Sequence, residues 1–292
     1  MILILILKSM RPQQWLKNFF IYAPIIFSQN LFNFPLLIRT TVAFIAFCIL
    51  SGSLYIFNDL QDIEEDKQHP QKSKRPLASG RLKKSTATVS TVILAPLAFI
   101  IAGTLNQEFF IICLIYGTLQ IIYSLWLKYV VIVDVFVIAA GFLLRVVAGG
   151  LVINVSLSSW LLICTILLAF FLAMSKRRHE LVLLEHNAQN HRSILREYSP
   201  YLLDQMMAVV TASTLIAYSL YTISTETINK FGTKKLIYTI PFVLYGIFRY
   251  LYLVHQKSEG GSPEALIIKD KPLLVDIFLW AMTVVLILQF RR

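Results

Sequence analysis

The sequence is dominated by apolar stretches that are each long enough to cross a lipid bilayer. A hydrocarbon core about 30 Å thick needs roughly 20 apolar residues in an α-helix, and in lipid every backbone polar group must find its partner within the protein. Windows that meet this length lie at 16–34, 36–57, 86–105, 109–127, 131–153, 157–174, 206–225, 236–254 and 272–290. The sequence therefore predicts an all-α, polytopic membrane protein, a bundle of about nine transmembrane helices in a single domain, 1–292.

The basic residues are distributed unevenly over the predicted loops. The formal net charge is +11, and nineteen Lys and Arg residues fall on one side of the membrane, against six on the other. Because cytoplasmic loops hold the excess of Lys and Arg, we expect the N-terminus in the cytoplasm and the C-terminus outside the plasma (inner) membrane. No nucleic-acid-binding motif accompanies the charge, so the membrane and not nucleic acid is the expected partner. The sequence leaves the oligomeric state, including a homo-oligomer, open.

A run of acidic residues follows the second predicted span. Asn58, Asp62 and Asp66 recur every four residues, and Asp59 lies three and seven residues before Asp62 and Asp66. A helix leaving the span would place all four side chains on one face, where like charges repel. Mg²⁺ binds such sparse carboxylates and completes its coordination with waters and substrate phosphate oxygens. The pattern predicts a Mg²⁺ site of Asn58, Asp62 and Asp66, assisted by Asp59.

Basic residues come next, and they complement the acidic run. Lys72, Arg75 and Lys83 follow within a short distance, and such side chains neutralise phosphate oxygens that a metal does not reach. Together the two parts predict a pyrophosphate clamp. An ordinary charged loop with a solvated helix end is the alternative. The particular spacing of the acidic residues in 58–66 and of the basic residues in 69–80 favours the clamp. The expected catalytic residues are Asp59, Asp62, Asp66, Lys72 and Arg75.

Two charges lie inside the fifth predicted span. Asp134 and Arg145 are eleven residues apart, and charges at such depth are costly, so they normally face a polar cavity or each other. They are predicted to contact substrate, with a structural tether as the alternative. Lys128 and Tyr123 flank the cytoplasmic end of the same segment. They are predicted to reach a phosphate or ribose, the alternative being an ordinary interfacial position.

Two residues near the predicted cytoplasmic surface are further candidates for substrate contact. Lys17 lies just inside the first span, at the depth of a lipid phosphate, although membrane topology alone also explains a lysine there. Tyr55 lies one turn before Asn58 and offers a hydroxyl to the same pocket. Tyrosine is also common at the membrane interface, so an anchoring role is the alternative for Tyr55.

With this acidic motif, the chain resembles the UbiA superfamily of intramembrane prenyltransferases, whose hallmark is Asn-Asp-x-x-Asp-x-x-x-Asp. Within it, the branch of decaprenyl-phosphate phosphoribosyltransferases is the most similar. The stretches that support this are "RPQQWLKN" at Arg11–Asn18, "RPLASG" at Arg75–Gly80, "YSLWLKYVVIVDVFVIAAGFLLRVVAGG" at Tyr123–Gly150, "SKRRHEL" at Ser175–Leu181 and "SPEALIIKDKPL" at Ser262–Leu273. The resemblance implies a nine-helix bundle with a cytoplasm-facing polar cavity. It also implies Mg²⁺-dependent transfer of a phosphoribosyl group from phosphoribosyl pyrophosphate to a polyprenyl phosphate, as a step toward a cell-wall precursor.

The residues after the sixth predicted span distinguish this branch from its relatives. Aromatic prenyltransferases of the superfamily carry a second acidic motif there, whereas this sequence has Lys176 and Arg177 and no Asp-x-x-x-Asp in 175–205. These cations suit an additional phosphate group and are predicted to bind substrate. A prenyl transfer to an aromatic acceptor is the alternative enzyme. A transporter with Asp134 and Arg145 on its pathway is the non-enzymatic alternative, and it leaves 58–80 unexplained.

Overall fold

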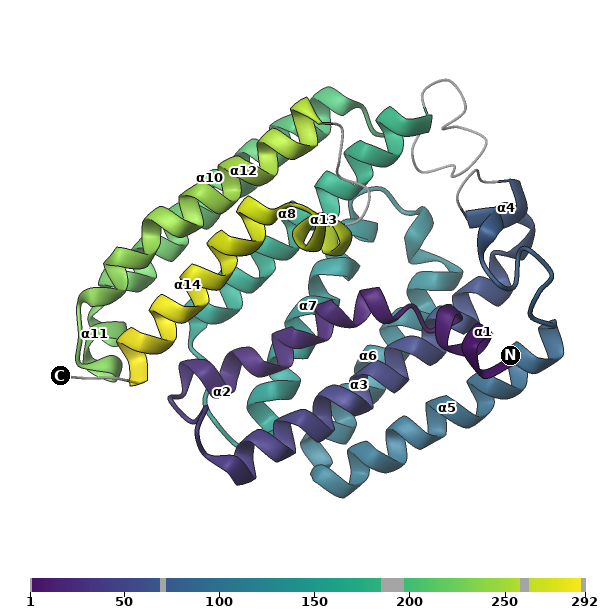
Figure 1. Ribbon diagram of the computed structural model, residues 1–292, viewed down its shortest axis with the longest axis horizontal. Coiled ribbons are helices and arrows are strands. Elements are labelled where there is room, and N and C mark those ends of the chain that lie inside the picture. The colour runs from purple at the N-terminus through teal and green to yellow at the C-terminus, as the bar shows by residue number, and fades with distance from the viewer. Residues whose placement is uncertain (1, 69–71, 185–196, 258–262, 290–292) are drawn as a thin grey trace. The chain divides into compact units, whose positions relative to one another are not determined.

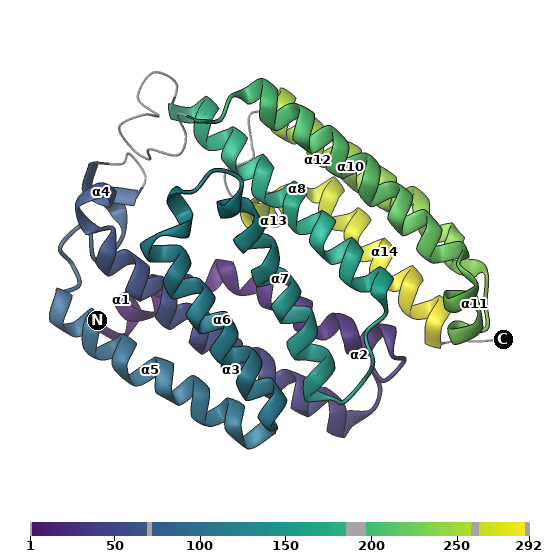
Figure 2. The same cartoon turned by 180° about the vertical axis from the view of Figure 1, so that it is seen from behind.

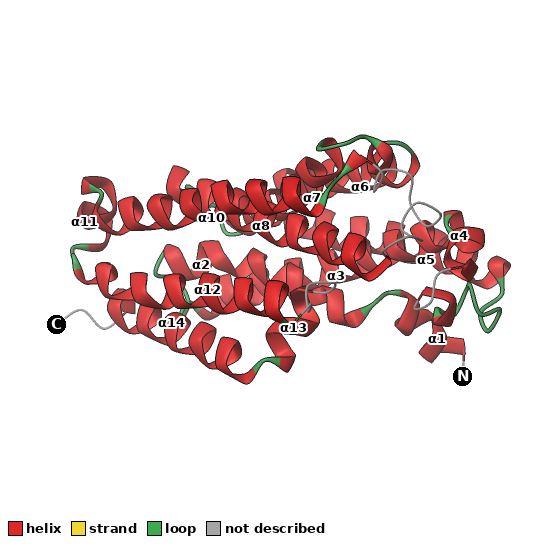
Figure 3. Cartoon of the chain, turned by 90° about the horizontal axis from the view of Figure 1, so that it is seen from above, coloured by secondary structure: helices red, strands yellow, loops and turns green. Residues whose placement is uncertain are grey.

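The computed structural model describes residues 2–68, 72–184, 197–257 and 263–289, and in these ranges the chain is helical without a β-strand (Figure 3). With η denoting a 3₁₀ helix, the segments are α1 (Ile2–Ser9), η1 (Pro12–Tyr22), α2 (Ala23–Phe27), α3 (Phe34–Gln61), α4 (Ile63–Gln68), η2 (Lys72–Lys74), α5 (Lys84–Leu105), α6 (Gln107–Leu125), η3 (Leu127–Tyr129), α7 (Val133–Val152), α8 (Ser159–Leu184), α10 (Pro200–Ile223), α11 (Thr225–Phe231), η6 (Lys235–Thr239), α12 (Ile240–Gln256), α13 (Pro263–Lys269) and α14 (Lys271–Gln289). The predicted all-α fold is confirmed.

Eight helices in the described part of the chain are long and apolar enough to cross a membrane. This confirms a multi-pass membrane protein, while the predicted count of nine is not confirmed. The difference lies in the first predicted span, 16–34, which forms η1 and α2 and leaves the helical conformation at Ser28. Pro24 lies in the first turn of α2, where its missing N–H is tolerated, and Gln29 has a left-handed backbone with φ 61°. The segment is therefore divided and does not form one continuous helix.

The described residues divide into two compact units, of which the first comprises 2–137 and 144–156. Here α3 packs along α5, and η1 and α6 also pack on α3 (Figures 1 and 2). Ala43 and Ala46 of α3 share a buried cluster with Ala98 and Ala102 of α5. Small residues let helices in a membrane approach closely, which explains how α3 and α5 pack side by side.

Gly149 on α7 lies directly against the backbone of η1 in the first unit. A Cβ atom at Gly149 would lie 2.1 Å from the carbonyl oxygen of Ile21. Only glycine leaves room for this backbone, so the contact fixes η1 against α7. It also fixes the position of Asn18, one turn earlier in η1.

The second unit comprises 138–143, 157–184 and the described residues from 197 onward. In it α8 packs on α10 and α12 packs on α14. A hydrogen-bond chain joins three of its segments: Trp280 Nε1 donates to Tyr218 Oη at 2.9 Å, and the Tyr218 and Thr239 hydroxyls are 2.6 Å apart. Satisfying such polar groups inside the unit removes the cost of burying them in an apolar medium.

Candidate active site

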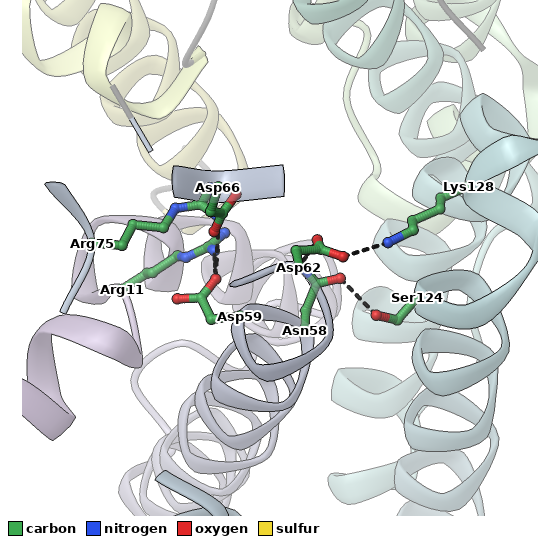
Figure 4. Close-up of polar contacts among 8 residues, drawn as sticks. All are labelled: Arg11, Asn58, Asp59, Asp62, Asp66, Arg75, Ser124 and Lys128. Atoms are coloured by element: carbon green, nitrogen blue, oxygen red, sulfur yellow. Dashed lines mark hydrogen bonds and ion pairs between the residues drawn. The ribbon is translucent and has the colours of Figure 1, made fainter. Parts of the chain in front are cut away.

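The acidic motif lies where α3 ends and α4 begins. Asp62 follows the last residue of α3, its N–H donates to the Asn58 carbonyl at 3.0 Å, and the Asp66 N–H donates to the Asp62 carbonyl at 2.8 Å. The spacing therefore stays nearly helical across the break. The four side chains nevertheless point in two directions, with Asp59 and Asp66 on one side and Asn58 and Asp62 on the other (Figure 4). The expectation of a single acidic face is corrected in this respect.

Asp59 and Asp66 are bridged by arginines. Asp59 is 1% exposed, and its Oδ1 accepts hydrogen bonds from Arg11 and, at 3.2 Å, from Arg75 Nη1. Arg75 Nη1 also donates to Asp66 Oδ2 at 2.5 Å, and its side chain is 23% exposed. The Arg11 guanidinium lies over the Tyr55 ring, 4.8 Å from its centroid. Two carboxylates and two guanidinium groups thus form one network, which is named the arginine network below and in which both Arg11 (25%) and Arg75 (23%) are partly exposed.

Asn58 and Asp62 face the end of α6 and η3. The Asn58 amide donates to Asp62 Oδ2 at 2.8 Å, and its oxygen accepts from the Ser124 hydroxyl at 2.6 Å. Lys128 Nζ donates to Asp62 Oδ1 at 2.6 Å. Burial lowers the pKa of the Lys128 ammonium, but the hydrogen bonds and charges of Asp62 and Tyr129 together outweigh burial and raise this pKa above its ordinary value. The ammonium is therefore held in its charged form next to Asp62.

The chemistry of this helix end fits Mg²⁺ delivered with a phosphate ligand. In the described ranges, no three His, Cys, Asp or Glu side chains lie close enough together to hold a metal ion by themselves. Mg²⁺, however, commonly uses only one or two carboxylates and takes its other ligands from water and substrate phosphates. Asn58 and Asp62 place an amide oxygen and a carboxylate on one side of the helix end, and Asp66 places a carboxylate on the other side. Oxygen is the ligand type that Mg²⁺ prefers.

Arg145 lies deep in the first unit, where an amide and a phenol accept hydrogen bonds from it. Its Nε donates to Asn18 Oδ1 at 2.7 Å, its Nη2 donates to Tyr116 Oη at 2.8 Å, and the guanidinium lies 4.8 Å from the Tyr116 ring centroid. Arg145 is 4% exposed, and Asp134 is fully buried in the first turn of α7. The charge of Arg145 is thus stabilised in part by an amide, a phenol and an aromatic face.

The other predicted residues are spread over both units. In the first unit, Lys17 lies in η1, Lys72 in η2 and Tyr123 in α6, while Lys83 is exposed just before α5. In the second unit, Lys176 and Arg177 lie in α8. Arg177 is 1% exposed, and its Nη1 donates to Glu180 Oε2 at 2.7 Å. The structure thus joins Asn58, Asp62 and Lys128 in one group and Asp59, Asp66 and Arg75 in another.

Four residues with important contacts were missed by the sequence interpretation. Arg11, Asn18 and Ser124 bind site residues in the first unit, and Asp204 binds Arg178 in the second. Arg11 and Asn18 do bound the "RPQQWLKN" stretch, which was a signal that their positions matter. Ser124 and Asp204 have partners 66 and 26 residues away along the chain, and local spacing holds no information about such pairs.

Comparison with known proteins identifies the family. The model of the "UbiA prenyltransferase family" matches residues 19–282. A decaprenyl-phosphate phosphoribosyltransferase of Corynebacterium glutamicum is 30% identical, over 96% of this chain and 85% of the relative. The enzyme of the same name from Mycolicibacterium smegmatis is 28% identical, over 96% of this chain and 91% of the relative.

Solved structures agree with this assignment at the level of the fold. A UbiA homolog from Archaeoglobus fulgidus, solved bound to GPP and Mg²⁺, superimposes with a TM-score of 0.71 over 97% of this chain and 99% of the homolog, at 16% identity. The match of the family model over most of the sequence and the shared helical fold lead to one conclusion. The chain belongs to the UbiA prenyltransferase family.

Proposed function

We propose that this protein transfers a phosphoribosyl group from phosphoribosyl pyrophosphate to a polyprenyl phosphate and releases pyrophosphate. The observation that carries the proposal is the nearly full-length likeness to two enzymes named decaprenyl-phosphate phosphoribosyltransferase. The oxygen ligands and cations gathered where α3 ends support it. In this proposal, the protein lies in the plasma membrane and its active site faces the cytoplasm. Residues 1–292 act as one domain, which is supported by a family match that includes residues of both units.

Mg²⁺ is the proposed cofactor, with Asn58, Asp62 and Asp66 as its protein ligands and Asp59 assisting. In this proposal, Asp66 leaves Arg75 and turns toward the side of Asn58 and Asp62 when the ion binds. When bound, the ion neutralises charge on the departing pyrophosphate. Arg75 and Lys72 hold outer phosphate oxygens, for which the partial exposure of the Arg75 side chain leaves access. Lys128, kept charged beside Asp62, supplies a further cation at the edge of the same site.

The chemistry requires one bond to break and one to form at the ribose C1 atom. The bond from C1 to the pyrophosphate oxygen breaks, and an oxygen of the lipid phosphate forms the new bond to C1. A phosphate oxygen is already a nucleophile at neutral pH, so no side chain has to remove a proton, and positioning of the two substrates supplies much of the rate. The residues proposed to position them are Lys17, Tyr55, Lys83, Tyr123, Asp134, Arg145, Lys176 and Arg177.

Purified protein in lipid nanodiscs allows a direct test. Labelled phosphoribosyl pyrophosphate and a polyprenyl phosphate should yield a labelled lipid and pyrophosphate, and chelation of Mg²⁺ should stop the reaction. A parallel reaction with a prenyl pyrophosphate and an aromatic acid tests the alternative that the family name and the GPP-bound homolog favour. Product in the parallel reaction alone would replace phosphoribosyl transfer by prenyl transfer. Absence of product in both would contradict the enzymatic proposal.

A further inference from the structure

Arg11 occupies an unusual position between α1 and η1. Its backbone is left-handed, with φ 52° and ψ 70°, and it directly precedes Pro12. A left-handed backbone is unfavourable for an arginine, and more so before a proline, where an extended backbone is preferred. Such a conformation is kept where the surroundings determine it. The turn is closed by hydrogen bonds, because the Arg11 N–H donates to the Lys8 carbonyl at 3.1 Å and the Gln14 N–H donates to the Arg11 carbonyl at 2.8 Å. The turn therefore has a defined geometry that sets where the side chain goes.

The Arg11 side chain makes two contacts with α3. Its Nη2 bonds Asp59 Oδ1, and its flat guanidinium lies over the Tyr55 ring, one turn earlier on the same helix. Guanidinium groups combine stacking and hydrogen bonding in one plane, which an ammonium group does not do. The contact is therefore specific for arginine.

Asp59 connects Arg11 to Arg75. The single oxygen Asp59 Oδ1 accepts from both guanidinium groups, and Arg75 additionally bonds Asp66 (Figure 4). With Arg11 present, the two positive charges of the arginine network balance its two carboxylates. Without Arg11, Asp59 and Asp66 together would hold Arg75 more tightly, and less of its charge would remain for an incoming phosphate.

We propose that Arg11 is a positioning residue that, through Asp59, keeps Arg75 available to bind a diphosphate. Arg11 does not itself contact the substrate in this scheme. The inference rests on the proposed function for the identity of the diphosphate, but the coupling between the two arginines belongs to the protein alone.

The test is a double-mutant cycle on Arg11→Gln and Arg75→Gln. Arg11→Gln should raise the KM for phosphoribosyl pyrophosphate about tenfold, as expected if the charge-assisted hydrogen bond from Arg75 to the diphosphate is lost to Asp59 and Asp66. It should leave the KM for polyprenyl phosphate within about twofold. In the Arg75→Gln background, Arg11→Gln should have no further effect on the donor KM. A persisting tenfold effect there, or an unchanged donor KM in the single variant, would overturn the proposal.

A matched control is Lys67→Gln, which removes a neighbouring cation that pairs with exposed Glu64 at 2.9 Å and should leave the donor KM unchanged. If Arg11→Gln fails to fold, Arg11→Lys keeps the charge without the planar fork and should raise the donor KM about threefold. A wild-type donor KM in Arg11→Lys would refute the role given to the guanidinium.

Calorimetric binding of inorganic pyrophosphate with Mg²⁺ should follow the same pattern over the cycle without any turnover. Failure of the proposed reaction and failure of the Arg11 proposal are therefore distinguishable.

Discussion

Both units contain pairs of cations and carboxylates, but the pairs are built differently. In the first unit, Arg75 and Asp59 are sixteen residues apart, and two arginines share one carboxylate oxygen. In the second unit, Arg178 of α8 binds Asp204 of α10 at 2.5 Å, and Arg249 of α12 binds Asp270 at 2.8 Å. Asp270 also accepts the Leu273 N–H at 2.9 Å, in the first turn of α14.

The comparison separates two uses of the same chemistry. The Arg178–Asp204 and Arg249–Asp270 pairs of the second unit each join two separate segments one to one, as structural contacts do. The arginine network instead gathers two guanidinium groups, Arg11 from the turn before η1 and Arg75 from the loop after η2, on carboxylates at the end of α3 and in α4, and Asp59 shares one oxygen between both. A shared carboxylate lets one arginine exchange it for a charged ligand while the other keeps the contact. The predictions below test this distinction.

The largest expected effect is on turnover when the acidic motif is changed. Asp62→Asn and Asp66→Asn should each lower Mg²⁺-dependent turnover by at least about 100-fold, because each removes charge where Mg²⁺ and pyrophosphate are proposed to bind. Asp204→Asn in the second unit should change turnover by less than about threefold, since it loses a partly exposed pair. Near-wild-type turnover in either motif variant would contradict the assignment of the site.

Two glycines provide a matched pair for stability. Gly149→Ala should destabilise the protein by about 3 kcal/mol, because the new Cβ would meet the Ile21 backbone, which cannot move aside as a side chain can. In the second unit, the Cβ of Gly246→Ala would lie 3.0 Å from the Asp276 Oδ2 atom, at the end of a side chain that can shift. The latter change should cost less than about 1 kcal/mol, because alanine also favours the helix. Equal unfolding midpoints of the two variants in detergent would contradict this difference.

A lysine in place of arginine should also destabilise the protein more at Arg145 in the first unit than at Arg178 in the second unit. Arg145→Lys loses the planar contact with Tyr116 and leaves a buried hydrogen-bonding group of Asn18 or Tyr116 without its partner, at a cost of about 2 kcal/mol. Arg178→Lys keeps a single bond to a partly exposed carboxylate and should cost about 0.5 kcal/mol. Thermal unfolding of both variants measures the difference. A larger loss of stability in Arg178→Lys than in Arg145→Lys would contradict the prediction.

The smallest expected effects concern pH. Because the pKa of Lys128 is raised by Asp62, the stabilisation from this pair is complete below the unfolded pKa of about 10.4 and is lost as pH rises through the folded value. The hydrogen bond from Arg249 lowers the pKa of Asp270, so that contribution is present above about pH 3.9 and is lost as pH falls through the folded value.

Lys128→Gln should therefore flatten the alkaline side of the stability curve, and Asp270→Asn should flatten the acid side. Unfolding midpoints measured across both pH ranges provide the check. An Asp270→Asn variant that changed the alkaline side instead would contradict this assignment of the two pairs.

The membrane class and the main helices could be predicted from the sequence because their cause is local. Each long apolar run has one favourable conformation in lipid, and polar residues such as Asn33 and Asn106 mark helix starts by accepting N–H groups of the first turn. The segment 16–34 was predicted to be a span because it is apolar enough to cross a bilayer, and this ninth span is not confirmed. The end of its helix at Ser28 and the pairing of Asn18 with Arg145 depend on backbone turns and on partners far along the chain.

The candidate site was only partly accessible to the same reasoning. Helical spacing indicated that 58–66 carries a functional group of side chains, but it gave no information about which cations approach from which side. Arg11 and Lys128 arrive from opposite sides of α3 and divide the motif into two groups. Positions of long-range partners follow from tertiary packing and not from local propensity, so the sequence left them undetermined.

The left-handed turn at Arg11 has a practical consequence for handling this protein. α1, with exposed apolar side chains at Ile2, Leu3, Ile4 and Leu7, lies directly before the turn. A bulky fusion partner or purification tag joined ahead of α1 would displace that turn and disturb the contact of Arg11 with the Asp59 carboxylate. A tag placed behind α14 avoids this mechanical coupling and is the better choice for biochemical assays.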